Sequence, residues 1–272
     1  MLLLVDLDGV VYRGRVPVPG VAEVLQRRAA AGDTVVYVTN NSRWHRTEYL
    51  ARLREAGVPV TADRVVTSAR ATAVALSEWE PAPGIAMVLG GPGLARELRD
   101  EGIRTVAPTP SGAAADVDAL VVGVDFALSY RRLSVAAETV RRGALFVATN
   151  RDANYPTADG LTAGAGAIVA AVEVAGGRPP DLVIGKPEPR LFTAAAEIVG
   201  EDVHDAVVIG DGLLTDIAAA NAVGARSVLM LTGVTTAEHL ERAPRSAHPT
   251  AVAADAGELH FALERLASES AA

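Results

Sequence analysis

The chain has 272 residues, half of them hydrophobic, and its 33 acidic against 25 basic residues give a net charge of −8. This acidic balance argues against nucleic acid or an anionic membrane as the main partner. Cysteine is absent, which excludes disulfides, zinc–thiolate sites and thiol nucleophiles. The apolar start of the chain is interrupted at Asp6 and is too short for a signal peptide or a membrane span, so we expect a cytoplasmic protein.

Short β-branched apolar runs alternate along the chain with stretches of helical period, a pattern that is typical of parallel βα units. The predicted strands are Leu2–Val5, Thr34–Val38, Arg64–Val66, Ile85–Leu89, Ile103–Val106, Ala119–Val124, Leu145–Ala148, Leu182–Ile184, Ala206–Ile209, Ser227–Leu231 and Ala251–Ala253. An amphipathic helix is predicted over Ala256–Ser268.

Because eleven strands are too many for one small sheet, we expect two α/β domains. Segments rich in proline and glycine at 80–84 and 176–180 bracket the middle of the chain and are typical of domain crossings. We therefore predict one domain made of residues 1–73 and 183–272, with residues 74–182 inserted as the second.

Four predicted strands end in polar residues, and in an open parallel sheet all such ends lie on one rim. The first strand is followed by Asp6 and Asp8, which point to the same side of an extended chain, while Gly9 lets the chain turn away. An Asp-x-Asp pair is expected by chance in a chain with this many aspartates, so this motif is weak alone.

Thr39 and Asn40 follow the second of these strands. Their hydroxyl, amide and backbone N–H groups form a natural cradle for an anion, although an ordinary helix cap is the alternative. Lys186, the only lysine among the 25 basic residues, follows the third strand. A compact ammonium suits a crowded site shared by an anion and a carboxylate, whereas the alternative is merely an arginine-rich composition.

The fourth strand leads into Asp211, which lies between Gly210 and Gly212. Glycine on both sides of Asp211 indicates close approach by a ligand. For Asp216, which opens the next helix, an ordinary helix cap is a strong alternative. Several acids on one rim repel each other unless a hard cation lies among them, and oxygen ligands without histidine or cysteine select Mg²⁺. The lysine and the strand-end hydroxyl favour a phosphoryl group beside that cation.

In order and spacing, these four motifs resemble those of haloacid dehalogenase superfamily phosphatases. The insertion, with its segments 148–152 and 164–166, resembles the large α/β cap of the NagD-like branch. The resemblance implies a Rossmann-like parallel-sheet core with an inserted cap domain. It also implies Mg²⁺-dependent hydrolysis of small-molecule phosphate monoesters through an aspartyl-phosphate intermediate.

The resemblance further implies a role for each motif residue. Asp6 is expected to be the nucleophile, and Asp8 to protonate the leaving alkoxide and later deprotonate water. Thr39 and Asn40 are expected to hold the phosphoryl oxygens, which Lys186 neutralises.

The same resemblance assigns Mg²⁺ to Asp6, the backbone carbonyl of Asp8 and Asp211, with Asp216 orienting Lys186 or a metal-bound water. The fourth motif departs from the sequence that is commonest in the family at positions 212 and 214, which are glycine and leucine here. Because the acids themselves are kept, we expect this departure to touch contacts at the rim of the site rather than metal binding.

A loop after the strand at 145–148 is the candidate for substrate specificity, although an Asx-rich turn is the alternative. Its candidate residues are Asn150, Arg151, Asp152 and Tyr155. Trp44 and His45, beside the second motif, are predicted to be packing residues rather than catalysts.

The expected partner is a small phosphorylated metabolite, because a cap that closes over the site excludes water and bulky substrates. Phosphoglycolate, glycerol phosphate, sugar phosphates, nucleotides and pyridoxal phosphate all fit, and a homodimer is left open. Two alternatives are kept. One is a phosphotransferase or mutase on the same scaffold, and the other is a non-catalytic phospholigand-binding module, which would require loss of Asp6 or Asp8.

Overall fold

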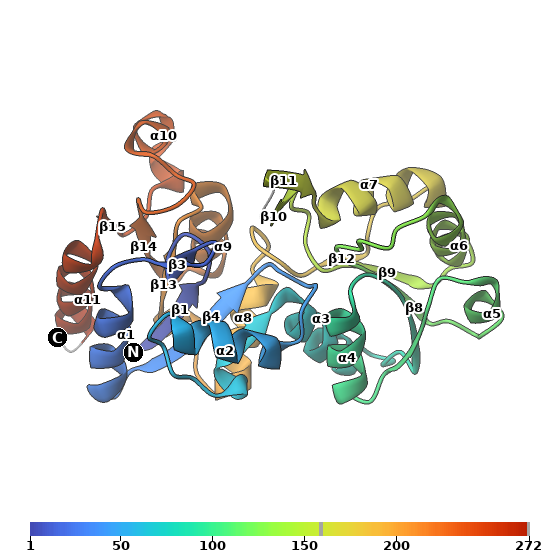
Figure 1. The fold of residues 1–272 in the computed structure, drawn as a ribbon, viewed down its shortest axis with the longest axis horizontal. Coiled ribbons are helices and arrows are strands. Elements are labelled where there is room, and N and C mark those ends of the chain that lie inside the picture. Colours follow the sequence, from blue (N-terminus) through green and yellow to red (C-terminus); the bar gives the residue numbers. More distant parts are fainter. Residues whose placement is uncertain (158–159, 271–272) are drawn as a thin grey trace. The chain divides into compact units, whose positions relative to one another are not determined.

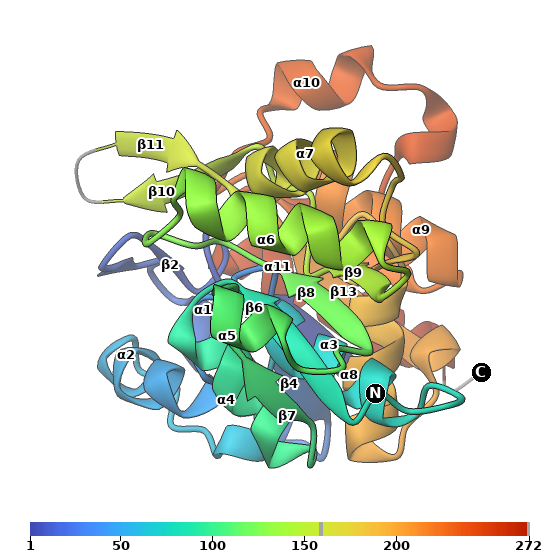
Figure 2. The same ribbon diagram turned by 90° about the vertical axis from the view of Figure 1, so that its right-hand side faces the viewer.

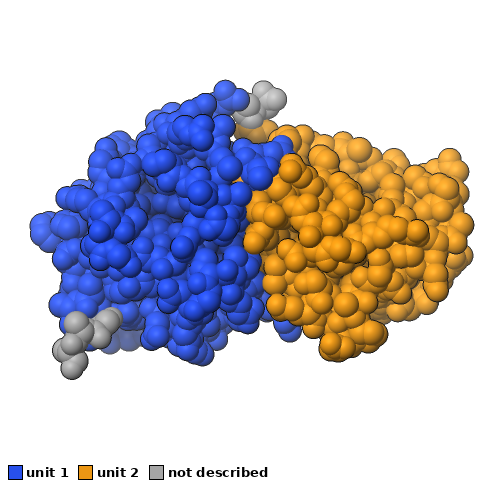
Figure 3. All heavy atoms as spheres, turned by 90° about the horizontal axis from the view of Figure 1, so that it is seen from below, with its two compact units in different colours: residues 1–39, 47–66, 186–272 blue, residues 40–46, 67–185 orange. Residues whose placement is uncertain are grey.

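The computed structural model describes residues 1–157 and 160–270. The chain divides into two compact units, coloured separately in Figure 3. Unit 1 comprises residues 1–39, 47–66 and 186 onward, and unit 2 comprises residues 40–46 and 67–185. The predicted insertion, 74–182, lies inside unit 2, which also takes in the segment 40–46; that the two parts act as core and cap stays a prediction.

A six-stranded sheet forms the centre of unit 1, in the order β15-β14-β13-β1-β4-β5. Its strands are β1 (Leu2–Asp6), β4 (Thr34–Thr39), β5 (Val65–Thr67), β13 (Ala206–Gly210), β14 (Arg226–Met230) and β15 (Ala251–Ala253). The β1 pairs with β4 and β13 are parallel, as are β13 with β14 and β14 with β15. Both faces of β1 are buried, which explains its continuous apolar run.

Helices of unit 1 pack in pairs, α1 (Val21–Ala30) with α11 (Ala256–Ser270) and α8 (Arg190–Val199) with α9 (Ala218–Val223). The other helices are α2 (Tyr49–Glu55), α10 (Ala237–Arg242) and several single turns. The chain builds the sheet outward from β1 in one direction and from β13 in the other. The order therefore reverses between β1 and β13, and residues that follow their carboxyl ends converge there.

Unit 2 contains a five-stranded sheet in the order β12-β9-β8-β6-β7, and its neighbouring strands are parallel. The strands are β6 (Ile85–Leu89), β7 (Arg104–Val106), β8 (Ala119–Val122), β9 (Leu145–Ala148) and β12 (Leu182–Val183). Figures 1 and 2 show α6 (Tyr130–Arg141) and α7 (Ala165–Gly176) on one face, with α3 (Ser68–Ser77) and α4 (Pro92–Asp100) on the other. A short helix, α5 (Pro110–Ala113), precedes β8. The core on the α6 and α7 face is built around Phe146, Leu120 and Val172.

The fold class and all the predicted strands are confirmed, each within two residues of its predicted ends. Two short antiparallel hairpins lie outside the predicted set, namely β2 (Tyr12–Arg13) with β3 (Val16–Pro17) and β10 (Asn154–Thr157) with β11 (Gly160–Ala163). Strands of two to four mostly exposed residues carry too little apolar alternation to be recognised. Over the described ranges, no helix combines the length and the apolar character needed to cross a membrane.

Candidate active site

Lys186 joins two of the predicted motifs inside unit 1. Its Nζ donates hydrogen bonds of 2.6 Å to Oδ1 of Asp6, at the end of β1, and of 2.6 Å to Oδ1 of Asp216. All three side chains are almost completely buried. Because both ion pairs are desolvated, removing Lys186 would leave two buried carboxylates without their cation.

Asp211 follows β13 and is held by the main chain of the segment that follows β14. Its Oδ2 accepts a 2.7 Å hydrogen bond from the N–H of Val234. Gly9 and Gly233 press against its carboxylate, and a Cβ at either position would overlap it. Gly9 also has a φ of +83°, a conformation that favours glycine. These glycines admit the carboxylate of Asp211 beside the turn after β1.

Asp216 lies in a turn of π-helical geometry over Leu213–Ile217. Its Oδ2 accepts hydrogen bonds from the N–H of Gly212 (3.0 Å) and from Oγ1 of Thr215 (3.2 Å), while Oδ1 accepts from Lys186. A Cβ at position 212 would overlap Thr215, so glycine suits this turn. The other departure from the family wording, Leu214, has a largely exposed side chain.

Asp8 is more open to solvent than the other acids, with about half of its side chain exposed. Its Oδ1 lies 3.6 Å from Nη2 of Arg52, a residue of α2 whose guanidinium stacks 3.7 Å from the ring centroid of Tyr12. Sequence reasoning missed Arg52, because it lies on an ordinary amphipathic helix without a motif. Its position was set by packing on the β2–β3 hairpin, which was also missed.

The electrostatics of this cluster follow from burial and from mutual repulsion. Burial raises the pKa of Asp6 well above its ordinary value, the charges of Asp216 and Asp211 add to this, and Lys186 opposes it. Burial and the charge of Asp216 raise the pKa of Asp211 to about 6. Burial alone would lower the pKa of Lys186, but the two carboxylates that it bonds outweigh this and raise it. The lysine therefore keeps its charge, whereas the raised pKa values of Asp6 and Asp211 disfavour their ionised forms.

The donor set fits a hard divalent cation. Carboxylate oxygens of Asp6, Asp211 and Asp216 all lie within 4.8 Å of one another. Three carboxylates against the single ammonium of Lys186 leave an excess of negative charge in a buried place. Oxygen donors without nitrogen or sulfur suit Mg²⁺ or Ca²⁺.

Thr39 and Asn40 belong to different units, although they are consecutive. Thr39 ends β4 in unit 1 and is buried. Asn40 is held in unit 2, where its Nδ2 donates to Oδ1 (3.0 Å) and Oδ2 (3.1 Å) of Asp152. Its carbonyl accepts from Oγ of Ser68 (2.5 Å) and from Nδ2 of Asn150 (2.7 Å). Two of the loop residues predicted for specificity thus contact a residue of the second motif.

The other two predicted loop residues have different partners in unit 2. Arg151 is half exposed and pairs with Glu173 on α7 at 2.5 Å. Tyr155 accepts a 3.1 Å hydrogen bond from Nδ2 of Asn41 and meets the ring of Phe126 edge-on. The loop is therefore tied to the segment 40–46 at two places.

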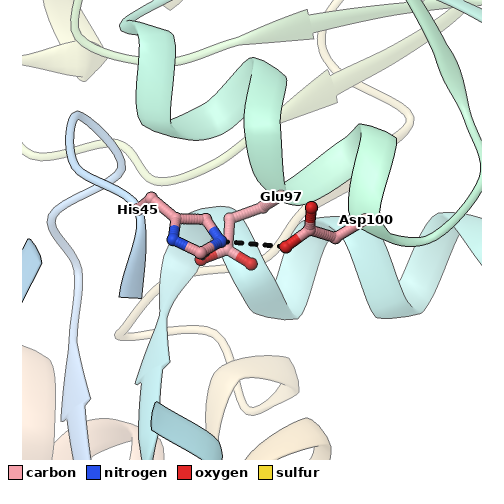
Figure 4. A group of neighbouring side chains, drawn as sticks. All are labelled: His45, Glu97 and Asp100. Atoms are coloured by element: carbon pink, nitrogen blue, oxygen red, sulfur yellow. Dashed lines mark hydrogen bonds and ion pairs between the residues drawn. The ribbon is translucent and has the colours of Figure 1, made fainter. Parts of the chain in front are cut away.

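A second group of ionisable side chains lies in unit 2 (Figure 4). The buried His45 has its Nε2 3.0 Å from Oδ2 of Asp100 and 3.5 Å from Oε1 of Glu97. Arg46 pairs with Glu97 and with Asp100, at 3.1 Å to the latter, and its main-chain N–H donates to Glu97 at 2.8 Å. Trp44, the other residue predicted to pack, lies beneath the guanidinium of Arg43 at 4.5 Å. These contacts fasten the segment 40–46 to α4.

Comparison with known proteins gives a consistent picture. A family model described as haloacid dehalogenase-like hydrolase matches residues 3–104, and a related hydrolase model matches residues 183–259. The chain is 37% identical to an acid sugar phosphatase of Staphylococcus saprophyticus over 262 residues, which cover 96% of this chain and 97% of the relative.

Two solved structures are also similar. The glycerol phosphate phosphatase of Mycobacterium tuberculosis, in complex with magnesium, has a TM-score of 0.85 at 38% identity, over 95% of this chain and 76% of that one. NagD from Escherichia coli K-12 has a TM-score of 0.84 at 30% identity, over 94% and 96% of the two chains.

Proposed function

We propose that this chain, which belongs to the haloacid dehalogenase-like hydrolases and is a phosphatase of the NagD-like kind, hydrolyses phosphate monoesters of small metabolites with Mg²⁺ and through an aspartyl phosphate. The observation that carries the proposal is the ammonium of Lys186 placed 2.6 Å from both Asp6 and Asp216. The ammonium opposes the rise that burial causes in the pKa of Asp6, and so favours the ionised form that a carboxylate nucleophile requires.

In the first step, a carboxylate oxygen of Asp6 attacks phosphorus and the bond from phosphorus to the leaving alkoxide breaks. Asp8 gives its proton to that alkoxide. Partial burial raises the pKa of Asp8, although the cations of Arg52 and Lys186 oppose this. A raised pKa helps the carboxyl to keep its proton until the alkoxide needs it.

In the second step, water attacks the aspartyl phosphate, Asp8 takes a proton from that water, and inorganic phosphate leaves with Asp6 restored. Lys186, Thr39 and Asn40 hold the phosphoryl oxygens throughout. The support for Lys186 is its permanent charge, and the support for Thr39 is its place at the end of β4, next to β1 in the sheet.

Mg²⁺, when bound, would neutralise charge that develops on the phosphoryl oxygens. Asp6, Asp211 and the carbonyl of Asp8 would hold it. Asp216 is already engaged with Gly212 and Lys186, so we assign it the task of fixing the ammonium. The excess negative charge of the three carboxylates supports the assignment of Mg²⁺ to this cluster.

The substrate is proposed to be a small phosphorylated metabolite, and the names of the relatives favour esters of sugars or polyols. A panel of phosphate esters, assayed with wild type and Arg151→Ala, tests whether the 150–155 loop selects among them. An unchanged ranking of substrates would remove Arg151 from that role.

The direct test of the covalent mechanism is an acid quench during turnover of p-nitrophenyl phosphate, followed by peptide mass spectrometry. We expect phosphate on the peptide that contains Asp6, and its loss on treatment with hydroxylamine, which cleaves acyl phosphates. Turnover without phosphate on that peptide would reject the aspartyl-phosphate route while leaving the phosphatase activity in place.

A further inference from the structure

We infer that Asp152 and Asn150 are positioning residues that act through Asn40, and that the side-chain amide of Asn40 is a tether rather than a ligand of the phosphoryl group. The inference rests on the proposed function in one respect, namely that Asn40 belongs to the phosphoryl-binding segment. All the contacts that carry it lie within unit 2.

The side chain of Asn40 faces a carboxylate. Its Nδ2 donates to both oxygens of Asp152, at 3.0 and 3.1 Å. The opposite orientation of the amide would set Oδ1 against a negative charge, so the geometry defines which end points at Asp152. The remaining polar atom of the amide, Oδ1, is an acceptor and would repel a phosphoryl oxygen.

Oδ1 of Asn40 is also closed in by the chain. A Cβ at Gly185, the residue before Lys186, would lie 2.6 Å from this oxygen and 2.7 Å from the Cβ of Asn150. Glycine at 185 is therefore what lets Asn40 and Asn150 pack here. Because Nδ2 is taken by Asp152 and Oδ1 is an acceptor, what Asn40 can offer an anion is its main-chain N–H.

The main chain at Asn40 is fixed by two donors. Its carbonyl accepts from Oγ of Ser68 at 2.5 Å and from Nδ2 of Asn150 at 2.7 Å. Ser68 and Asn150 are both buried, so these bonds are protected from water. Together they hold the plane of the peptide that follows Asn40.

Asn150 and Asp152 are also joined to each other by a hydrogen bond. Oδ1 of Asn150 accepts the N–H of Asp152 at 3.0 Å, which closes an Asx turn and sets the direction of the Asp152 side chain. The 150–152 turn thus binds the side chain of Asn40 through Asp152 and its carbonyl through Asn150. We infer that this loop affects the reaction by positioning Asn40, in addition to any contact with the substrate.

A double-mutant cycle on kcat/KM for p-nitrophenyl phosphate tests the inference. Asp152→Ala and Asn40→Ala should each lower kcat/KM by about tenfold, and the double variant should lose no more than the worse single variant, because Asp152 acts through Asn40. In Asp152→Ala, KM and the inhibition constant of inorganic phosphate should rise together. Asp152→Asn keeps one acceptor oxygen and should recover part of the loss.

Asp181→Ala is the matched control. Its carboxylate accepts from the N–H of Phe146 at 2.7 Å and from Arg178 at 2.6 Å, so it also has two donors in unit 2, but none in the segment 40–46. A general loosening of unit 2 would affect this variant equally, whereas positioning of Asn40 leaves its KM unchanged.

Hydrogen–deuterium exchange separates failure of this inference from failure of the proposed function. Amides of the segment 40–46 should exchange faster in Asp152→Ala than in wild type or Asp181→Ala, whether or not the protein hydrolyses any ester. Additive losses in the cycle, or unchanged exchange with unchanged KM, would overturn the positioning role. A wild type that releases no phosphate but shows the exchange difference would reject the function and keep the tether.

Discussion

Each unit of the chain contains a cluster of three side chains of the kinds that bind metal ions. In the part of the chain that the structure describes, the ligand atoms of each cluster lie within 4.8 Å of one another. The clusters are Asp6, Asp211 and Asp216 in unit 1, and His45, Glu97 and Asp100 in unit 2. Distances alone therefore do not separate them, and the difference lies in the cation that accompanies each.

In unit 2 the cation is an arginine. The fork of Arg46 reaches both Glu97 and Asp100, and its main-chain N–H adds a further donor to Glu97. Two carboxylates thus share a guanidinium and the imidazole of His45. This cluster is an ionic network that holds α4, and the guanidinium of Arg46 already pairs with each of its two carboxylates.

In unit 1 the cation is a lysine, and one ammonium serves two of three carboxylates. Asp211 is instead bonded by the N–H of Val234. The excess of negative charge is what a cation and a phosphoryl group bound to it would balance. Charge balance, rather than ligand spacing, distinguishes a candidate catalytic centre from a structural network.

The largest expected effect is that of Asp6→Asn, which should lower kcat by at least about 10³-fold. The amide is a poor nucleophile and a weaker metal ligand, so two functions are lost together. Circular dichroism and thermal unfolding should show a folded protein. A cleanly folded variant that keeps more than about a tenth of the activity would remove Asp6 from the nucleophilic role.

Exchanging the two cations sharpens the comparison. Lys186→Arg should lower kcat/KM by about 10²-fold although the charge is kept, because a planar guanidinium is larger than the ammonium that contacts Asp6 and Asp216 at 2.6 Å. The reciprocal change, Arg46→Lys, should cost about 1 kcal/mol of unfolding free energy with kcat nearly unchanged. A Lys186→Arg enzyme with wild-type rates would contradict the account of the solitary lysine.

The leaving group should report the role of Asp8. In Asp8→Asn, kcat/KM for alkyl phosphates should fall by about 10²-fold or more, and for p-nitrophenyl phosphate by much less, because p-nitrophenolate needs little protonation. Steady-state assays with both kinds of ester measure the difference. Equal losses for both would mean that Asp8 is not the general acid.

The pH dependence of stability follows from Asp211. Its pKa in the metal-free protein is about 6 against an ordinary value of 3.8, so between these values the folded state binds more protons than the unfolded state. Stability from this group is therefore lost as pH rises through that window. Mg²⁺ requires the ionised carboxylate, so it should raise Tm more at about pH 7.5 than at about pH 5.

Differential scanning fluorimetry with and without Mg²⁺ checks this. Asp211→Asn should abolish the Mg²⁺ effect at both pH values and remove the destabilisation of the metal-free protein above about pH 6. An equal gain in Tm at both pH values would separate Asp211 from metal binding.

The sequence predicted those parts of the fold and site that local patterns determine. Strand cores such as those around Leu4 and Val208 repeat apolar residues in short runs, and the acids follow the ends of those runs. The rule that parallel strands end on one rim then brings Asp6 and Asp211 together without any knowledge of packing.

The rest depends on contacts that no local pattern contains. Asn40 and Asp152 are separated by 112 positions, and their hydrogen bond follows from how the 150–152 turn packs beside the segment 40–46. Arg52 meets Asp8 because the β2–β3 hairpin carries Tyr12 under its guanidinium, and that hairpin is too short to predict. Likewise, the contact of His45 with Asp100 joins two distant positions within unit 2 that no local pattern relates.

Isothermal titration calorimetry with Mg²⁺ tests most directly the claim that charge balance selects the unit 1 cluster. We predict one Mg²⁺ site per chain in the wild type, no measurable binding in Asp211→Asn, and unchanged binding in Asp100→Asn, which alters the second cluster instead. Wild-type binding in Asp211→Asn, or its loss in Asp100→Asn, would contradict the account.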